Sequence, residues 1–224
     1  MIMSVRSRED ILGEVRTRLQ DPTAQTTAQV RSISSHVFNM IEDRRIEVVL
    51  DLCEQLLDDH RWACGVVAYD WAFRMRRQYS ERTFATFEAW LKQYVRGWGD
   101  GDDFCTHAFG ALLGQHGHLF DRILAWTEHP DFWVRRAAAV ILIYPLRKGQ
   151  LQGVDPFIVA DRLMSDGHHL VQKGYGWMLK ELSTSRPDDV YLYLLRNKTQ
   201  MPRVAFRYGL EKLAADRKAE LMQL

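Results

Sequence analysis

The sequence predicts an all-α fold, an α-solenoid built from stacked pairs of helices. Hydrophobic residues recur at helical spacing along almost every stretch, and no segment shows the strict alternation of a half-buried strand. Clusters of Pro, Gly, Asn and Asp interrupt this pattern about every 15 to 20 residues, which matches one helix and its loop. A weak internal repeat of about 36 residues indicates that the helices form equivalent pairs. We expect a single domain over residues 1–224.

Twelve helices are predicted between the turn-forming clusters. In chain order they span residues 5–20, 25–40, 44–58, 61–78, 82–96, 103–115, 118–127, 132–147, 155–165, 168–184, 187–196 and 203–222.

Three of these helices begin in a similar way. Each follows a polar break and opens with an aromatic or apolar residue: Asp59-His60-Arg61-Trp62, His129-Pro130-Asp131-Phe132-Trp133 and Asp166-Gly167-His168-His169-Leu170. Trp133 and Leu170 are 37 residues apart, and Trp62 and Trp133 are 71 apart, roughly two such units. A HEAT-like solenoid requires a two-helix unit of this length, because each pair buries its apolar face only against its neighbours.

The composition is that of a globular protein, with 46% hydrophobic and 26% charged residues, which excludes disordered and collagen-like classes. The chain contains no run of about 18 apolar residues, and its N-terminus lacks the apolar region of a secretory signal, so we expect an intracellular, cytoplasmic protein. Its three cysteines have no short paired spacing, which argues against disulfides or a cysteine zinc site. We predict a monomer with no metal and no cofactor.

The two halves of the chain differ in net charge, which is negative in the first half and positive in the second. Lys+Arg 30 and Asp+Glu 29 nearly cancel overall, but residues 1–112 hold 14 basic and 17 acidic groups, whereas residues 113–224 hold 16 and 12. Of the basic residues, 23 are Arg, whose planar guanidinium matches phosphate geometry.

The repeat relates several of these cations to one another. In the helix predicted over 168–184, Lys173, Trp177 and Lys180 form a stripe separate from the apolar stripe. A shift of 37 residues carries Lys173 onto Arg136, and a shift of 34 in the other direction carries it onto Arg207. Equivalent positions of a solenoid line one surface, so these cations predict a track for a nucleic-acid backbone. An ordinary solvated face is the alternative.

Residues 96–105 are the least ordinary stretch, with the sequence Arg-Gly-Trp-Gly-Asp-Gly-Asp-Asp-Phe-Cys. The simplest interpretation is a glycine loop followed by Asp102 or Asp103 as the N-cap of the next helix. The Asp-Gly-Asp spacing is also found in calcium loops, but no acidic residue closes a 12-residue frame, so no calcium site is predicted.

Four motifs carry a resemblance to a known family. They are Trp98 with Asp102 and Phe104-Cys105, residues 132–139 (Phe-Trp-Val-Arg-Arg-Ala-Ala-Ala), residues 171–181 (Val-Gln-Lys-Gly-Tyr-Gly-Trp-Met-Leu-Lys-Glu), and Met201-Pro202-Arg203 followed by Arg207-Tyr208 and Glu211-Lys212. Over roughly residues 60–215 the sequence resembles the HEAT-like-repeat DNA alkylation repair family, the AlkD-type alkylpurine DNA glycosylases. The resemblance implies an enzyme that hydrolyses the N-glycosidic bond of cationic N3- and N7-alkylpurines in double-stranded DNA.

The resemblance also implies roles for individual residues. Trp98 and Trp177 would flank the modified nucleotide, Asp102 would lie near its deoxyribose as the catalytic carboxylate, and Arg136 and Arg135 would contact the DNA backbone. Lys173, Lys180 and Arg207 complete the predicted DNA-binding residues. Family members commonly have Asp directly after the motif Trp, where this chain has Gly99. This departure leaves open which of Asp100, Asp102 and Asp103 faces the DNA.

These residue types suit the implied chemistry. A purine alkylated at N3 or N7 is cationic and leaves without a general acid, so the enzyme needs to stabilise an oxocarbenium-like sugar, which a nearby carboxylate does electrostatically. Tryptophan faces attract cations. Two alternatives remain from the sequence: a non-catalytic paralogue that binds branched or distorted DNA, and a protein-interaction solenoid.

Overall fold

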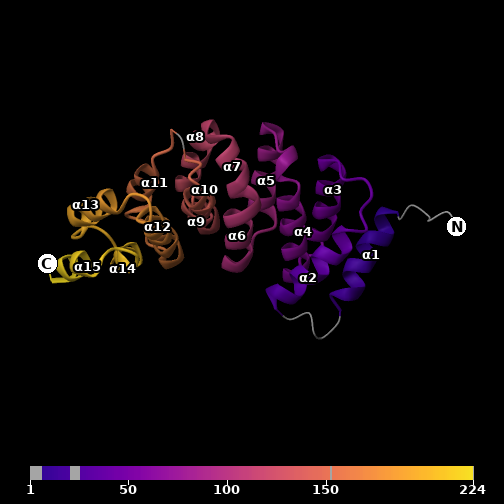
Figure 1. The fold of residues 1–224 in the computed structure, drawn as a ribbon, viewed down its shortest axis with the longest axis horizontal. Coiled ribbons are helices and arrows are strands. Elements are labelled where there is room, and N and C mark those ends of the chain that lie inside the picture. The colour runs from indigo at the N-terminus through magenta and orange to yellow at the C-terminus, as the bar shows by residue number, and fades with distance from the viewer. Residues whose placement is uncertain (1–6, 21–25, 152, 224) are drawn as a thin grey trace. The chain divides into compact units, whose positions relative to one another are not determined.

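The computed structural model describes residues 7–20, 26–151 and 153–223, and all regular structure in these ranges is helical (Figure 1). No strand occurs among them, which confirms the predicted all-α class. The chain divides into two compact units, Met1–Val95 and Arg96–Leu224, so a single domain over the whole chain stays a prediction. The helix starts expected at residues 5 and 25 lie outside the described residues. None of the described helices has the length and apolar character needed to cross a membrane.

The first unit consists of α1 (Arg8–Arg18), α2 (Thr27–Phe38), α3 (Ile46–Leu57), α4 (Trp62–Arg74), the short 3₁₀ helix η1 (Arg76–Gln78) and α5 (Glu81–Gln93). Ser7 begins α1 with a capping box, in which its hydroxyl accepts from the backbone N–H of Asp10. Helix α4 packs against α2 and α3, and its fully buried Trp71 donates its indole N–H to the carbonyl of Ser34 at 3.1 Å. These helices therefore share one apolar core.

The second unit contains the remaining helices. They are α6 (Trp98–Phe104), η2 (Cys105–Phe109), α7 (Gly110–Gln115), η3 (Gly117–Leu119), α8 (Phe120–Ala125), η4 (Trp126–Glu128), α9 (Phe132–Val140), α10 (Ile143–Lys148), α11 (Pro156–Leu163), α12 (His169–Leu182), α13 (Pro187–Asn197), α14 (Arg203–Leu210) and α15 (Ala215–Gln223).

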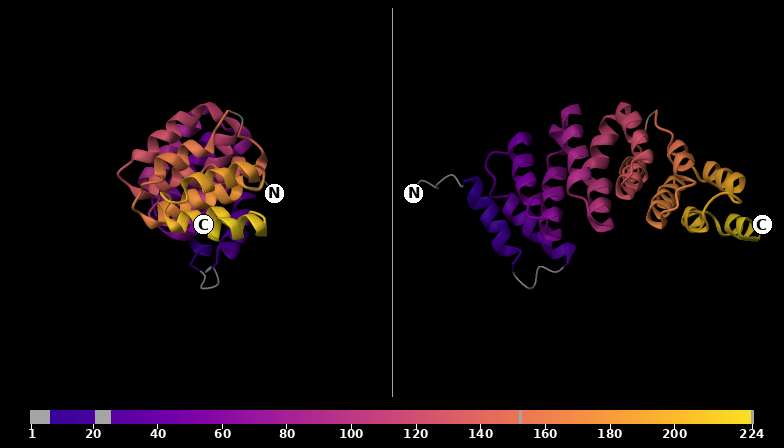
Figure 2. Two further views of the ribbon diagram at one scale, coloured as in Figure 1. Left: turned by 90° about the vertical axis from the view of Figure 1, so that its left-hand side faces the viewer. Right: turned by 180° about the vertical axis from the view of Figure 1, so that it is seen from behind.

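Three helices of this unit follow the repeat derived from the sequence. Helices α9, α12 and α14 begin at Phe132, His169 and Arg203, which are 37 and 34 residues apart, and α12 packs against both of the others. They lie in succession in the second unit (Figure 2). Because each buries its apolar face against the next, the structure confirms the helical-repeat arrangement.

Two predicted helices are broken in two. Residues 132–147 form α9 and α10, because Pro145 lacks an N–H and its ring disfavours a helical carbonyl at residue 141. Residues 203–222 form α14 and α15, separated by a turn that buries Leu213.

The stretch around Trp98 differs most from its prediction. Helix α6 begins at Trp98, with Gly97 as its N-cap, and continues through the π-helical turn η2 into α7. The interpretation of Asp102 or Asp103 as an N-cap is therefore wrong, since both lie inside α6. The glycines and aspartates of residues 97–103 resemble a loop in the sequence, which explains why the pattern predicted a start at residue 103.

Candidate functional site

The second unit contains a cavity of about 360 Å³ that receives residues from α6, α9, α12 and α14. Its lining residues are Trp98, Asp102, Arg136, Leu170, Lys173, Trp177 and Tyr208. Five of the eight residues predicted for the site thus lie around one cavity, although they are spread over about 80 residues of sequence.

Asp102 is the acidic residue of its cluster that faces this cavity. Asp103 lies instead beside His107, with 3.2 Å between its Oδ1 and Nδ1 of the histidine. Asp100 also lies outside the cavity lining, and burial, together with the neighbouring Asp103 charge, raises its pKa. Of the three aspartates, Asp102 is therefore the one that lines the cavity, and its orientation toward DNA stays a prediction.

A two-pronged ion pair holds Asp102. Arg136 donates from Nε to Oδ1 at 2.9 Å and from Nη2 to Oδ2 at 2.7 Å, and its Nη1 donates to the carbonyl oxygen of Leu170. The Arg136 side chain is 9% exposed and that of Asp102 is 18% exposed. Since a two-pronged pair fixes both position and plane, the carboxylate has a defined orientation toward the cavity.

Gly174 of α12 makes room for this arginine. A Cβ atom at position 174 would lie 3.1 Å from Cγ and 3.3 Å from Nη1 of Arg136, closer than most Cβ contacts. The glycine before Tyr175 therefore allows α9 to place a long buried side chain against α12.

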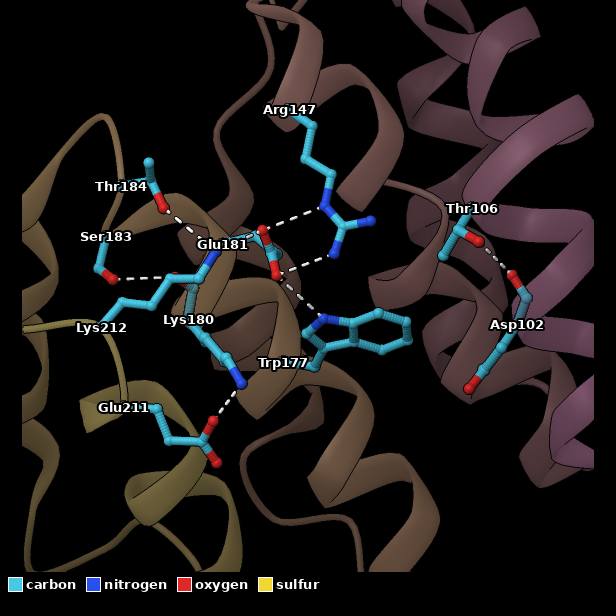
Figure 3. A network of polar contacts seen from close by, with 10 residues as sticks. All are labelled: Asp102, Thr106, Arg147, Trp177, Lys180, Glu181, Ser183, Thr184, Glu211 and Lys212. Carbon is cyan, nitrogen blue, oxygen red and sulfur yellow. Dashed lines mark hydrogen bonds and ion pairs between the residues drawn. The ribbon is translucent and has the colours of Figure 1, made fainter.

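The buried carboxylate of Glu181 holds Trp177 at its indole nitrogen (Figure 3). Its indole Nε1–H donates to Oε1 of Glu181 at 3.2 Å. Glu181 also accepts from Nη2 of Arg147 at 3.0 Å and from Nζ of Lys212 at 2.8 Å. Burial disfavours the charged form of Glu181, but the hydrogen bonds from Arg147 and Lys212 outweigh it and lower the pKa to about 2. The indole ring extends from this network toward the side of the cavity where Asp102 lies.

Trp98 lies in the first turn of α6, and it is 63% exposed, unlike most other tryptophans of the described chain. At the next position, Gly99, a Cβ atom would meet no neighbouring atom within 4 Å. The absence of Asp after the motif Trp therefore reflects no packing constraint at this position.

Tyr208 completes the cavity wall and was missed as a site residue. At Gly176 a Cβ atom would lie 2.8 Å from both Cβ of Tyr208 and the carbonyl oxygen of Ala205, so only glycine allows α12 and α14 to approach this closely. This contact brings Tyr208 to the cavity beside Trp177. The signal in the sequence was its position directly after Arg207 in the C-terminal motif.

Three predicted residues lie outside this cavity. Arg135 donates Nε to Asp166 at 2.6 Å and Nη1 to the carbonyl oxygens of His129 and Pro130, so its guanidinium is committed to joining the N-terminal ends of two helices. Lys180 pairs with Glu211. Arg207 is exposed and lines a second cavity of about 510 Å³, together with Arg203, Val204, Tyr208 and Glu211.

The expected cation row differs between its members. Arg136 is buried and engaged by Asp102, whereas the side chains of Lys173 and Arg207 form no hydrogen bond or ion pair with another described residue. Lys173 and Arg207 are therefore available to an anion, while Arg136 positions a carboxylate.

The cavity combines aromatic faces with charged groups. The faces of aromatic rings such as those of Trp98 and Trp177 attract cations. Asp102 contributes a carboxylate whose charge Arg136 offsets, and Lys173 adds a positive charge at the same cavity.

The comparisons with known proteins identify the family and the fold. The family model described as DNA alkylation repair enzyme matches residues 24–213. No curated protein matches the sequence. Among solved structures, a predicted DNA alkylation repair enzyme from Enterococcus faecalis superposes with a TM-score of 0.65 at 18% identity, covering 85% of this chain and 87% of that chain, which shows a shared fold. Because the family model spans both units and every residue of the cavity, the chain belongs to the DNA alkylation repair enzyme family.

Proposed function

We propose that this DNA repair protein is a glycosylase that hydrolyses the N-glycosidic bond of cationic N3- and N7-alkylpurines in double-stranded DNA. The observation that carries the proposal is the joining of Asp102, Trp98 and Trp177 around one cavity of about 360 Å³. A carboxylate at a cavity that two tryptophans also line matches a nucleotide whose base is cationic before the bond breaks and whose sugar is cationic afterwards.

The reaction needs no protonation of the leaving group. The C1′–N bond breaks with its electron pair moving to the base, which departs as a neutral alkylpurine and leaves an oxocarbenium-like sugar. Asp102 stabilises the developing charge at C1′ and orients a water molecule, whose oxygen adds to C1′ as its proton leaves to solvent. The bidentate contact from Arg136 keeps the carboxylate in place as the charge develops.

The remaining residues supply binding. Trp98 and Trp177 contact the damaged nucleotide through their ring faces, a contribution of about 0.5–2 kcal/mol each. Lys173 and Arg207, which have exposed or cavity-facing cations, contact backbone phosphates and give affinity that is independent of sequence.

Release of N7-methylguanine and N3-methyladenine from alkylated duplex DNA tests this function. We expect release by the wild-type protein and a loss of about 100-fold or more in Asp102→Asn, because this change removes the charge but keeps the shape. The matched control is Asp103→Asn, one residue further along α6 and outside the cavity lining. Equal release by Asp102→Asn and wild type would overturn the catalytic role of Asp102.

The same experiment separates the alternatives. Salt-dependent DNA binding without release of any alkylated base would assign the chain to the non-catalytic DNA-binding proteins instead. Absence of DNA binding at low salt would favour a protein-interaction solenoid.

A further inference from the structure

Two charged residues are buried among the described residues, Arg136 and Glu181, each about 7% exposed. Burying a charge is costly unless it is paired, so the partners of a buried charge indicate what it does in the structure. Arg136 holds Asp102 at the cavity, whereas Glu181 lies outside the cavity lining and has no place in the chemistry proposed above. Its use must be sought in what it contacts.

Glu181 accepts hydrogen bonds from three segments of the second unit, and one of the donors is the indole ring of Trp177. Arg147 reaches it from α10, Lys212 from the turn after α14, and Trp177 from one turn earlier on α12 (Figure 3). Arg147 donates to both carboxylate oxygens of Glu181, and Lys212 donates to Oε2. Oε1 also accepts the indole N–H of Trp177. The ring of Trp177 is therefore fixed at its Nε1 edge, and its opposite edge points into the cavity.

The same contact changes the electronic character of the ring. An indole that donates its N–H to a carboxylate gains electron density over its face, which strengthens its attraction for a cation. The guanidinium carbon of Arg147 lies 5.8 Å from the ring centroid, so an unneutralised Arg147 would act as a competing cation. Glu181 pairs with that arginine through both carboxylate oxygens and offsets its charge.

We propose that Glu181 is a positioning residue that fixes Trp177 through its indole N–H and increases the affinity of the ring face for a cationic nucleotide. The fixing of Trp177 stands on the contacts alone, whereas the cationic ligand rests on the proposed function. The two parts are therefore tested by different measurements on the same variants.

The first measurement is the ¹⁵N–¹H resonance of the Trp177 indole, assigned by its loss in Trp177→Phe. We expect Glu181→Leu to shift this resonance and speed its hydrogen exchange by about tenfold or more, because the N–H loses its acceptor. Glu181→Gln keeps a carbonyl oxygen at this point and restores most of the protection. Asp188→Asn, which removes the same charge from a surface pair with Arg217, leaves the resonance unchanged.

The second measurement compares two duplexes with each variant. One carries a pyrrolidine abasic analogue, whose ring nitrogen is protonated, and the other carries neutral tetrahydrofuran. We expect wild type to prefer the cationic duplex, Glu181→Leu to lose about fivefold to tenfold of this preference, and Glu181→Gln to lose part of it. Asp188→Asn retains the full preference.

The outcomes distinguish the two ideas. An unshifted Trp177 resonance in Glu181→Leu and Glu181→Gln overturns the positioning role. If the resonance shifts but wild type binds both duplexes equally, the proposed function fails, while the fixing of Trp177 by Glu181 stands. If wild type prefers the cationic duplex and both Glu181 variants keep that preference in full, the electronic role of Glu181 is overturned.

Discussion

Arg136 holds both oxygens of Asp102, at 2.9 Å and 2.7 Å, from a helix that begins 34 residues after α6. This pair joins α6 to α9, and the third donor of Arg136 joins both to Leu170 in α12. One guanidinium thus fixes the relative positions of three helices at the point where the candidate catalytic carboxylate lies.

Replacing Arg136 by Lys tests this relationship. An ammonium group cannot reproduce two parallel hydrogen bonds, so we expect the free energy of unfolding to fall by about 1–3 kcal/mol and base release to fall with it. Urea unfolding and a glycosylase assay measure the two effects. Arg8→Lys is the control, since Arg8 pairs with Asp51 at an exposed site and should lose less than about 1 kcal/mol. Similar losses in both variants would contradict a special role for the two-pronged pair.

Replacing Trp98 by Ala tests the affinity for DNA separately from the stability of the fold. Because its side chain is mostly exposed, Trp98→Ala should change the free energy of unfolding by no more than about 0.5 kcal/mol. The affinity for duplex DNA containing a cationic lesion analogue should fall by about 3-fold to 30-fold, the loss of one cation–π contact. Trp71→Ala, at a fully buried position of the first unit, should lower the free energy of unfolding by about 3–5 kcal/mol. Unchanged affinity in Trp98→Ala would remove Trp98 from the site.

The dependence of DNA affinity on salt distinguishes cations that contact phosphates from cations that are already paired within the protein. Lys173→Ala and Arg207→Ala should each reduce the slope of log affinity against log salt by about 1, because each removes one phosphate contact. Arg135→Ala should leave this slope unchanged and lower stability instead, since Arg135 is bound to Asp166 and two carbonyl oxygens. A reduced slope in Arg135→Ala would instead support the contact between Arg135 and the DNA backbone that the sequence predicted.

Glu181 makes stability depend on acid pH. Its pKa is about 2 in the folded protein against an ordinary value of 4.5, so its stabilising contribution is complete above pH 4.5 and is lost as the pH falls toward 2. In urea unfolding from pH 6 to pH 2.5, the free energy of unfolding of wild type should fall toward that of Glu181→Gln across this window. A difference between the two proteins that is constant with pH would contradict the lowered pKa.

Much of the fold follows from local sequence. Helical periodicity and turn residues placed most helices, and the repeat related α9, α12 and α14 before their contacts were known. The break before α10 also has a local cause, because Pro145 cannot continue a regular helix. The start of α6 at Trp98 was not predicted, because glycines and aspartates inside a helix resemble a loop.

Five of the seven residues that line the cavity were predicted from the sequence, whereas Leu170, Tyr208 and the contacts among the side chains were not. Resemblance and repeat selected Asp102, Trp98, Trp177 and Lys173, which line the cavity. The engagement of Arg136 by Asp102 and of Glu181 by Arg147 and Lys212 was not predicted, because each links residues 31 to 34 positions apart and depends on how the helices pack. Periodicity identifies which face of a helix a cation occupies, but only the packed structure shows whether a partner already neutralises it.

The close contact at Gly174 has a consequence for how this site can be altered. Position 174 lies outside the cavity lining, yet a methyl group there would press on Arg136 and, through it, displace Asp102. Substitutions in the buried interface between α9 and α12 can therefore alter the candidate site while every residue that lines the cavity is kept. In directed evolution of this protein, or in its natural divergence, selection on activity would act on such hidden interface positions as well as on the visible surface.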